Sequence, residues 1–401
     1  MVAVYILLVG AIVVFAMILR SGMKEIGIPS MIGFFMLGFL VRFMDNQWNL
    51  ISEQGFQIFD FLAELGIIVL LFRVGLESKV TKLIRWLPTA SKIWIGGVFF
   101  SGLLGFLASY YILGWELVQS LFVSVAMTAT SVGVTVSIWQ EANLLYTHHG
   151  EILLDVAELD DISGVILMAL LFAVAPVLKS GNIAATLPIL PEILGLFILK
   201  LIAFIAFCIF FSRYLEAHIT EFLERIQVGN GTLLVILGIG MVVAATAEML
   251  GFSVAIGAFF AGLIFSRDPD SVKFDGSFEP LYDLFMPFFF VGIGLKINPE
   301  IITGSLVPVV ILILVAFAGK LIGHGSIAYF VTGSSGALIF GTSMIPRAEI
   351  ALIIMQKGLS LGDWAVTPQI FANMVIVSAV TSLTIPLILR PVLNRQSQQL
   401  T

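Results

Sequence analysis

Residues 151–176 read EILLDVAELDDISGVILMALLFAVAP and contain two neighbouring aspartates in an otherwise apolar segment. The part from Ile152 to about Ala175 is long enough to cross a bilayer. A carboxylate at the centre of such a helix costs ~2.5–3.5 kcal/mol on translocon scales. Because the residues that follow Asp160 and Asp161 are too few to span a membrane alone, the sequence predicts that both carboxyl groups lie inside it.

The composition agrees with a membrane protein. The 401-residue chain is 59% hydrophobic and 11% charged, with a mean hydropathy of +1.08, whereas soluble domains carry about 25% charged residues. The net charge of −6 suggests no nucleic-acid partner. Cys208, the single cysteine, lies in an apolar run, so we expect no disulfide framework, no thiol metal site and no cofactor. The first residues lack a basic region and a cleavage site and are interpreted as a retained span.

The apolar segments predict an all-α polytopic protein with about thirteen transmembrane helices. The candidate spans are 3–20, 27–43, 56–75, 93–114, 118–139, 152–175, 184–212, 231–249, 252–266, 280–296, 303–331, 335–357 and 366–390. All six tryptophans fall at or near span ends, as expected for an interfacial aromatic belt.

Lysine and arginine in the connections predict the orientation. With the N-terminus outside and the C-terminus in the cytoplasm, the inner side receives twelve of these residues and the outer side four. The inner ones are Arg20, Lys24, Lys79, Lys82, Arg85, Lys92, Arg213, Arg225, Arg267, Lys273, Arg390 and Arg395. The outer ones are Arg42, Lys179, Lys296 and Lys357.

Two pairs of segments repeat with an offset of seven spans. GIPSMIGFFMLGF, 27–39, aligns without gaps on GFSVAIGAFFAGL, 251–263, and LLFRVGLE, 70–77, aligns on FFVGIGLK, 289–296. An odd offset makes the two copies run in opposite directions through the membrane. Inverted repeats of this kind, here two of six spans each, are typical of secondary transporters with a binding site near the midplane.

The same offset pairs the fifth span with the twelfth. Each carries a Thr-Ser pair in its middle, Thr130-Ser131 and Thr342-Ser343, and the twelfth adds Pro346, which removes a backbone donor. Backbone groups freed inside a membrane are tolerated where they line a cavity or a site. We therefore expect two discontinuous helices that meet at their breaks. Hydrogen bonding within ordinary helices also explains the Thr-Ser pair of the fifth span taken alone.

Further charged residues lie within predicted spans. Lys320 is too far from the inner end of its span to snorkel and is the natural counter-charge for one aspartate. Arg347 and Glu349 flank the predicted break and are expected to form a structural ion pair with each other or with Glu158. Within the third span, Glu64 either faces the site or is the counter-charge of Arg73. His148 and His149 are expected in an inner loop, where solvated histidines are more common than pH sensors.

These groups suit cation and proton exchange. A hard monovalent cation prefers oxygen ligands, which Asp161 and the Thr130 and Ser131 region supply, so Na⁺ at Asp161 and Thr130 is the predicted metal site. Burial of a carboxyl group raises its pKa, so one such group binds either a proton or a cation. Adjacent helical residues diverge by ~100°, which leaves Asp160 free to face another partner.

The chain resembles the bacterial monovalent cation:proton antiporters of the Kef/Nap branch. The resemblance covers essentially the whole chain and is carried by ELGIIVLLFRVGLE, TATS, ELDDISGV, GFSVAIGAFFAGLIF, FMPFFFVGIGL, Lys320 and IPRAEIALI. It implies that Asp161 binds cation and proton and that Asp160 pairs with Lys320. It also implies electrogenic exchange, since relatives with Asp-Asp rather than Asn-Asp at this place move net charge.

The resemblance further implies a homodimer in the bacterial inner membrane and a division of labour along the chain. Its parts are dimerisation domain 1–90 and 229–300, moving core 91–180 and 301–401, and linker helix 181–228. Arg73 departs from the motif, and the sequence offers no account of it. Because the sequence ends at Thr401, shortly after the last predicted span, we expect no C-terminal nucleotide-binding domain of the Kef type.

Three other functions remain to be weighed. A K⁺/H⁺ antiporter or Kef-like K⁺ efflux system would use the same ligand types, so sequence does not separate Na⁺, Li⁺ and K⁺. An intramembrane aspartyl protease needs two carboxylates that share a proton, and adjacent residues on one helix do not meet this need. A substrate receptor on a transporter-like scaffold is the third. No enzyme activity is expected.

Overall fold

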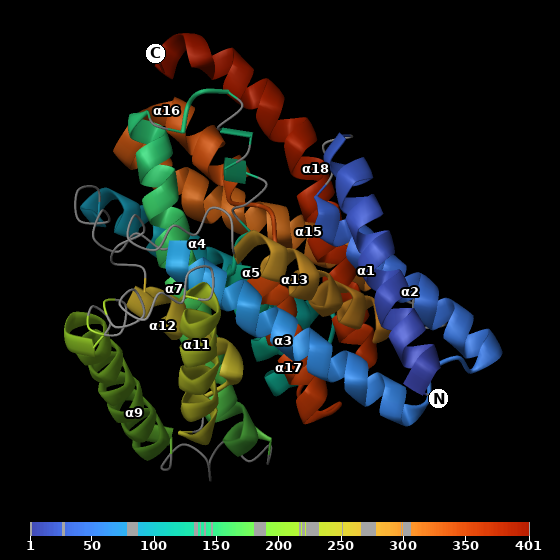
Figure 1. Cartoon of the computed structure of the whole chain (residues 1–401). Coiled ribbons are helices and arrows are strands. Elements are labelled where there is room, and N and C mark those ends of the chain that lie inside the picture. The colour runs from blue at the N-terminus through green and yellow to red at the C-terminus, as the bar shows by residue number, and fades with distance from the viewer. Residues whose placement is uncertain are drawn as a thin grey trace. The chain divides into compact units, whose positions relative to one another are not determined.

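The computed structural model describes most of the chain. The described residues are 2–25, 29–77, 87–131, 135–136, 138–139, 142–145, 147–179, 190–215, 218, 221, 232–250, 252–265, 278–297, 299 and 306–400. Every regular element within these ranges is helical (Figure 1). The described part of the chain therefore agrees with the predicted all-α class.

Six of the described helical segments are long and apolar enough to cross a membrane. They are Tyr5–Met23, Leu87–Ile112, His148–Leu178, Pro191–Leu215, Leu306–Ser334 and Pro368–Leu393. Three shorter apolar helices, Leu117–Thr128, Val235–Met249 and Val254–Phe265, fall below that length. The predicted count of thirteen spans stays a prediction.

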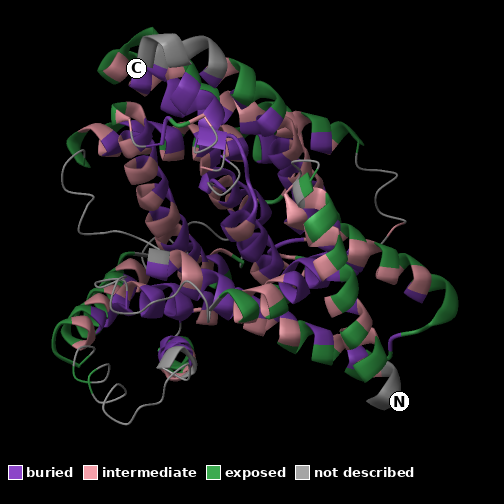
Figure 2. Cartoon of the chain, turned by 45° about the horizontal axis from the view of Figure 1, so that its top comes forward, coloured by how far each residue is buried: buried purple, intermediate pink, exposed green. Residues whose placement is uncertain are grey.

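The surface of the long helices suits lipid. Only 11% of the residues in the most apolar window of the first helix are buried, and that helix is largely green and pink beside the N label in Figure 2. Large apolar side chains such as Leu199, Ile202 and Leu314 are more than half exposed. A water-soluble protein rarely exposes this much contiguous apolar surface, so the chain is a multi-pass membrane protein.

One compact unit comprises residues 1–21, 33–82 and 172–295. Its helices are α1 (Val2–Glu25), α2 (Ser30–Trp48), α3 (Glu53–Glu77), α9 (Leu190–Phe210), α11 (Thr232–Met249), α12 (Val254–Phe265) and α13 (Phe278–Leu295). A π-helical turn, η2 (Phe211–Leu215), extends α9. Helix α3 packs on both α12 and α13 and forms the buried centre of this unit.

Glycines let these helices approach until their backbones touch. A Cβ atom at Gly38 would overlap the carbonyl oxygen of Val291, and one at Gly262 would overlap that of Phe72. The converse contacts place Gly294 on the Phe35 carbonyl and Gly75 on the Phe259 carbonyl. Small residues at close helix contacts are typical of membrane proteins, where van der Waals packing replaces a hydrophobic drive between helices.

The contacts of Arg73, for which the sequence offers no role, lie within the same unit. Its guanidinium carbon lies 4.2 Å from the centroid of the Tyr282 ring, and Nη2 is 3.5 Å from Glu279 Oε1. Arg20 of α1 forms ion pairs with Glu279 and with Asp283. Arg73 therefore holds the start of α13 to α3 through a cation–π contact and a shared carboxylate.

The second unit comprises residues 22–32, 83–171 and 296–401. Its helices are α4 (Leu87–Leu107), α5 (Leu117–Thr128), α7 (His148–Leu178, up to residue 171), α15 (Leu306–Lys320), α16 (Ser326–Ser343), α17 (Glu349–Leu361) and α18 (Pro368–Leu400). Two π-helical turns, η1 (Ala108–Ile112) and η4 (Leu321–Gly325), continue α4 and α15. The most deeply buried large side chains here include Trp139, Arg347, Phe122, Lys320 and Phe340.

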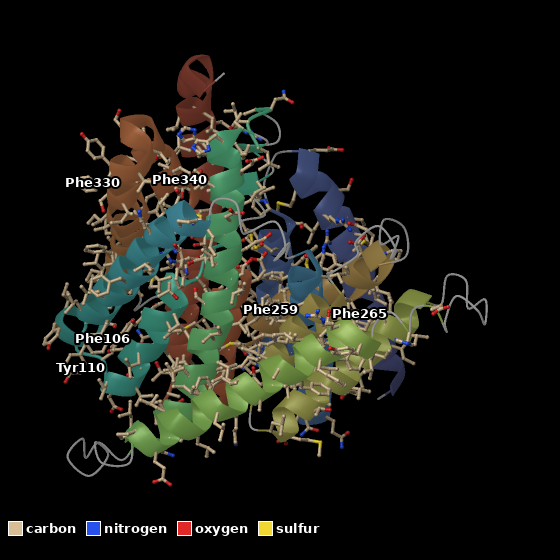
Figure 3. All side chains as sticks on the ribbon, turned by 90° about the vertical axis from the view of Figure 1, so that its left-hand side faces the viewer. Phe106, Tyr110, Phe259, Phe265, Phe330 and Phe340 are labelled. Atoms are coloured by element: carbon tan, nitrogen blue, oxygen red, sulfur yellow. The ribbon has the colours of Figure 1, made fainter. Side chains whose placement is uncertain are left out.

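Gly333 turns the chain back on itself within α16. Gly333 has a φ of 84°, a backbone conformation that favours glycine because this residue lacks a Cβ. The kink at this position divides α16 into two arms. Figure 3 labels Phe330 and Phe340, which lie on these two arms. Phe330 is 81% exposed and Phe340 is fully buried, so the first arm presents an apolar side chain outward while the second contributes to the core.

The predicted inner loop around His148 and His149 is wrong. Both residues belong to the first turn of α7, which begins four residues before the predicted span. The ring centroid of His149 lies 6.2 Å from that of Phe340. The apolar side chains that follow, such as Ile152 and Leu153, belong to the core cluster of this unit. Their packing stabilises the first turns of α7, so the helix begins before the predicted span.

Candidate ion-binding site

Two helices of the second unit stop in its interior, and their loose ends bond to each other. Helix α5 ends at Thr128, and Ala129 is already extended, with φ −65° and ψ 143°. Helix α16 ends at Ser343, and α17 starts only at Glu349. Both breaks lie at the positions that Thr130-Ser131 and Pro346 predict.

The backbone groups freed at each break are paired with groups of the other. Ser131 N donates to Pro346 O at 2.8 Å, and the Thr130 hydroxyl donates to Met344 O at 3.4 Å. The Thr135 hydroxyl donates to Ser343 O at 2.7 Å. These hydrogen bonds satisfy polar backbone atoms that have no water to bond with in an apolar interior.

Arg347 ties the two breaks together. Its guanidinium donates from Nη1 to Ile345 O at 2.7 Å and from Nη2 to Met127 O at 3.1 Å. The expected ion pair of Arg347 with Glu349 or Glu158 is therefore corrected, because the side chain bonds to backbone carbonyls of both breaks. The rigid fork of an arginine reaches two acceptors at once, which a lysine does not.

Helix α18 supplies hydroxyls that hold the same residue. The Arg347 amide donates to Thr381 Oγ1 at 3.3 Å, and its carbonyl accepts from Ser378 at 2.5 Å and from Ser382 at 3.3 Å. The sequence interpretation missed these three side chains. Their spacing in SAVTS, 378–382, puts them on one helical face and is the signal that could have revealed them.

Lys320 reaches both the first break and the aspartate pair. The side chain is fully buried, and Nζ donates to Thr128 O at 2.5 Å and lies 3.4 Å from Asp160 Oδ2. Asp160 is 1% exposed, and its other carboxylate oxygen makes no hydrogen bond within the described residues. A buried charge is retained only with a partner, so Lys320 and Asp160 compensate each other.

Asp161 has a different surrounding from its neighbour. It is partly exposed, and the charges that act on it are those of Asp160, Glu349, Glu158 and Lys320. The described residues contain no group of three or more His, Cys, Asp or Glu side chains placed to hold a metal ion. A cation at Asp161 would therefore take its remaining ligands from hydroxyl and carbonyl oxygens or water.

A family model for the transmembrane part of sodium/hydrogen exchangers matches residues 10–395 of the chain. The chain belongs to the sodium/hydrogen exchanger family. This confirms the resemblance inferred from the motifs. The members of the family are secondary transporters that exchange cations for protons, so this exchanger is an antiporter and not an enzyme.

Several named antiporters match the chain over most of its length, and one solved antiporter shares its fold. The exchanger is 31% identical over 343 residues to the high-affinity Na⁺/H⁺ antiporter NhaS3 of Synechocystis. The alignment covers 84% of this chain and 72% of NhaS3. It is 29% identical over 369 residues to the Na⁺/H⁺-K⁺ antiporter GerN of Bacillus cereus. That alignment covers 91% of this chain and 90% of GerN. Its fold matches the sodium proton antiporter MjNhaP1 of Methanocaldococcus jannaschii with a TM-score of 0.69 at 16% identity, over 100% and 99% of the chains.

Glu64 belongs to a different unit of this exchanger from the other predicted site residues. It lies on α3 in the first unit, whereas Asp160, Asp161, Lys320, Arg347 and the two breaks all belong to the second.

Within the second unit, α7 is braced by Trp94, whose Nε1 donates to Ser163 Oγ at 2.9 Å. Ser163 in turn donates to the Asp160 carbonyl at 3.0 Å. The indole therefore holds the helix at the aspartate pair.

Proposed function

We propose that this exchanger carries Na⁺ or Li⁺ against H⁺ by competition of the two for Asp161. The observation that carries the proposal is the unequal setting of two neighbouring aspartates. Asp160 is buried against Lys320, whereas the side chain of Asp161 is only partly covered by the protein and feels the charge of Glu349 at the start of α17. A carboxylate that no lysine or arginine of the described residues pairs directly can take up one ion or the other, and hydroxyls such as those of Thr130 and Ser131 would add oxygen ligands.

The exchange is proposed to be electrogenic. Asp160, Asp161 and Lys320 form three titratable groups in one site. With the cation bound, Asp161 is ionised and Asp160 pairs with the Lys320 ammonium. A second proton moves in the return step when the Asp160–Lys320 pair also changes its protonation.

Alternating access is proposed to come from the core parts, 91–180 and 301–401, moving against a homodimeric scaffold of 1–90 and 229–300, with 181–228 as linker. Inverted repeats fit the glycine contacts. If Phe35 and Gly38 correspond to Phe259 and Gly262, and Phe72 and Gly75 to Val291 and Gly294, each backbone contact of α2 with α13 has its counterpart between α12 and α3. The proposed setting is the bacterial inner membrane, with the N-terminus outside and the C-terminus inside.

Ion flux in proteoliposomes tests the function. A pH dye inside the vesicles reports proton movement when Na⁺, Li⁺ or K⁺ is added outside. We expect Na⁺ and Li⁺ to drive proton movement in the wild type and Asp161→Asn to abolish it while the protein inserts and elutes normally. Asp363→Asn, at an exposed aspartate between α17 and α18, is the matched control. Exchange by Asp161→Asn at the wild-type rate would remove this carboxylate from the mechanism.

K⁺/H⁺ exchange or Kef-like K⁺ efflux is the second candidate. One relative, GerN, carries K⁺ in its name as well as Na⁺. The oxygen ligands proposed here suit either ion, and the K⁺ arm of the same assay decides between them. Proton movement with K⁺ but not with Na⁺ would replace the first proposal with this one, and no movement with any cation would favour a receptor.

A further inference from the structure

A short chain of hydrogen bonds from another helix ends on the peptide group that joins the two aspartates. The carbonyl of this group belongs to Asp160 and accepts a hydrogen bond from Ser163 Oγ at 3.0 Å. The same hydroxyl accepts a hydrogen bond from Trp94 Nε1 at 2.9 Å. Ser163 is buried, and a hydroxyl that accepts one bond and donates another is held in one orientation. Helix α4 is therefore tied to the backbone of α7 at Asp161.

The indole of Trp94 is placed for this contact. Trp94 follows the first residue of α4, Leu87, by seven residues, which is about two turns into the helix. Its ring packs against the core cluster of the second unit. An indole has a single N–H donor, and here that donor is spent on a hydroxyl of α7. The ring thus fixes the donor, and the donor fixes Ser163.

Two further contacts lie on the same face of α7. Asp160, Ser163 and Gly164 are three and four residues apart and so share a face. The first of them forms the ion pair with α15 described above. A Cβ at Gly164 would come within 3.2 Å of Ile350 Cγ2 and 3.8 Å of Ala129 Cβ. This face of α7 is therefore fixed by α4, by α15 and by residues that follow the two breaks.

The helices that hold α7 are also packed on each other. A Cβ at Gly319 of α15 would come within 2.9 Å of Ser101 Cα on α4, and one at Gly323 of η4 within 2.7 Å of the Gly96 carbonyl oxygen. The hydrogen-bond chain joins α4 to α7, and the ion pair joins α7 to α15. The three helices form a closed ring of contacts, which resists rotation of α7 about its axis.

The rotation of α7 decides where the Asp161 carboxylate lies, because this side chain leaves the helix ~100° from Asp160. Side-chain tips lie about 5–6 Å from a helix axis, so a rotation of ~20° moves them by about 2 Å. Hard cations such as Ca²⁺ keep their oxygen ligands within a range of about 0.3 Å. A proton needs only one carboxylate oxygen. Such a rotation would therefore disturb cation binding far more than proton binding.

We propose that Trp94 and Ser163 are positioning residues that set the affinity of the Asp161 site for its cation. They do not touch the ion. They hold α7 at the rotation at which the Asp161 carboxylate meets the other oxygen ligands, and the proton, which needs no such arrangement, binds without them. This proposal rests on the competition of cation and proton proposed above.

The KM for the cation in proteoliposomes tests the role. Trp94→Phe keeps an aromatic ring and removes the N–H, and Ser163→Ala removes the hydroxyl. Removing groups that orient metal ligands typically costs 10–100-fold in metal affinity. For both variants we expect a KM for Na⁺ higher by about tenfold and a maximal rate within about twofold of the wild type. Ser163→Thr keeps a hydroxyl that can bond to the preceding turn and should restore the KM.

Two matched controls remove similar groups elsewhere. Ser109→Ala deletes a buried hydroxyl that donates to the Gly105 carbonyl at 2.7 Å. Trp364→Phe deletes an indole N–H that donates to the Leu361 carbonyl at 2.7 Å. Both are expected to keep the KM of the wild type.

The outcomes separate this proposal from a packing role and from the general function. An unchanged KM in Trp94→Phe and Ser163→Ala, with or without a lower melting temperature or maximal rate, would mean that the two residues only pack, and it would overturn the proposal. The proposed function would stand in that case. A wild type that exchanges no cation would overturn the proposed function, and the positioning role with it. If the wild type exchanges K⁺ instead, the KM for K⁺ takes the place of that for Na⁺.

Discussion

At the scale of single residues, the two neighbouring aspartates differ in their surroundings because their side chains leave the helix in different directions. Asp160 points to a buried lysine, while Asp161 stays partly open. A helical step of ~100° is enough to separate an ion pair from an exchange site. The high cost of two carboxylates within a span is offset for Asp160 by Lys320, and for Asp161 our proposal is that the carboxylate is retained because it exchanges cation and proton.

The Asp160–Lys320 pair is expected to hold the fold as well as serve the cycle. Lys320→Ala leaves Asp160 buried without a partner, and breaking a buried pair costs about 3–5 kcal/mol. Asp160→Ala is expected to cost a similar amount, and the double variant less than the two single costs added together. Thermal melting in detergent of the two single variants and the double variant measures the coupling. Strict additivity would mean that the two groups do not interact.

At the scale of elements, the breaks in α5 and α16 are stabilised by groups from other helices. Arg347 bonds to carbonyls at both breaks, and hydroxyls of α18 bond to its backbone. The helices of the first unit rely instead on glycines that bring backbones into contact. The second unit thus pairs the open backbone at its two breaks with polar groups, as our proposal of an ion-binding core expects.

The glycine contacts lead to a prediction for α12. Gly262→Ala puts a Cβ on the Phe72 carbonyl, a backbone atom that cannot rotate away. Overpacking of this kind typically costs 1–3 kcal/mol, so the melting temperature should fall. Gly238→Ala on α11 has open space at its Cβ and serves as the control. That control should melt at or slightly above the wild-type temperature, because alanine favours a helix by about 0.5–1 kcal/mol. Equal melting of both variants would contradict the close contact.

At the scale of the whole molecule, charge balance per cycle decides which energy source drives transport. An exchanger that moves one proton per cation ignores the membrane potential, whereas one that moves more protons than cations responds to it. At 100 mV one elementary charge is worth about 2.3 kcal/mol. The three titratable groups Asp160, Asp161 and Lys320 place this chain in the second class by our proposal.

Asp160→Asn is expected to make exchange electroneutral without abolishing it. Asparagine keeps hydrogen-bonding capacity next to Lys320 but carries no titratable proton. In proteoliposomes with an inside-positive potential imposed with valinomycin and no pH gradient, net charge leaves with the protons. The wild type should therefore accumulate Na⁺, and the variant should not. The variant should still respond to a pH gradient, which shows that it is active. Wild-type exchange that ignores the potential would remove the electrogenic mechanism.

The sequence by itself determined the class of the protein, the apolar segments and the places where helices break. These properties follow from neighbouring residues, because length, hydropathy and the missing donor of Pro346 act locally. It also placed Asp160, Asp161 and Lys320 inside spans and led to the correct family. Only the tertiary structure decided which groups meet. Asp160 and Lys320 lie 160 residues apart in the chain, and Arg347 bonds to a carbonyl 220 residues away. The partners of Arg347 and Arg73, the helical turn at His148 and the burial of His324 depend on packing between distant helices, which local patterns do not encode.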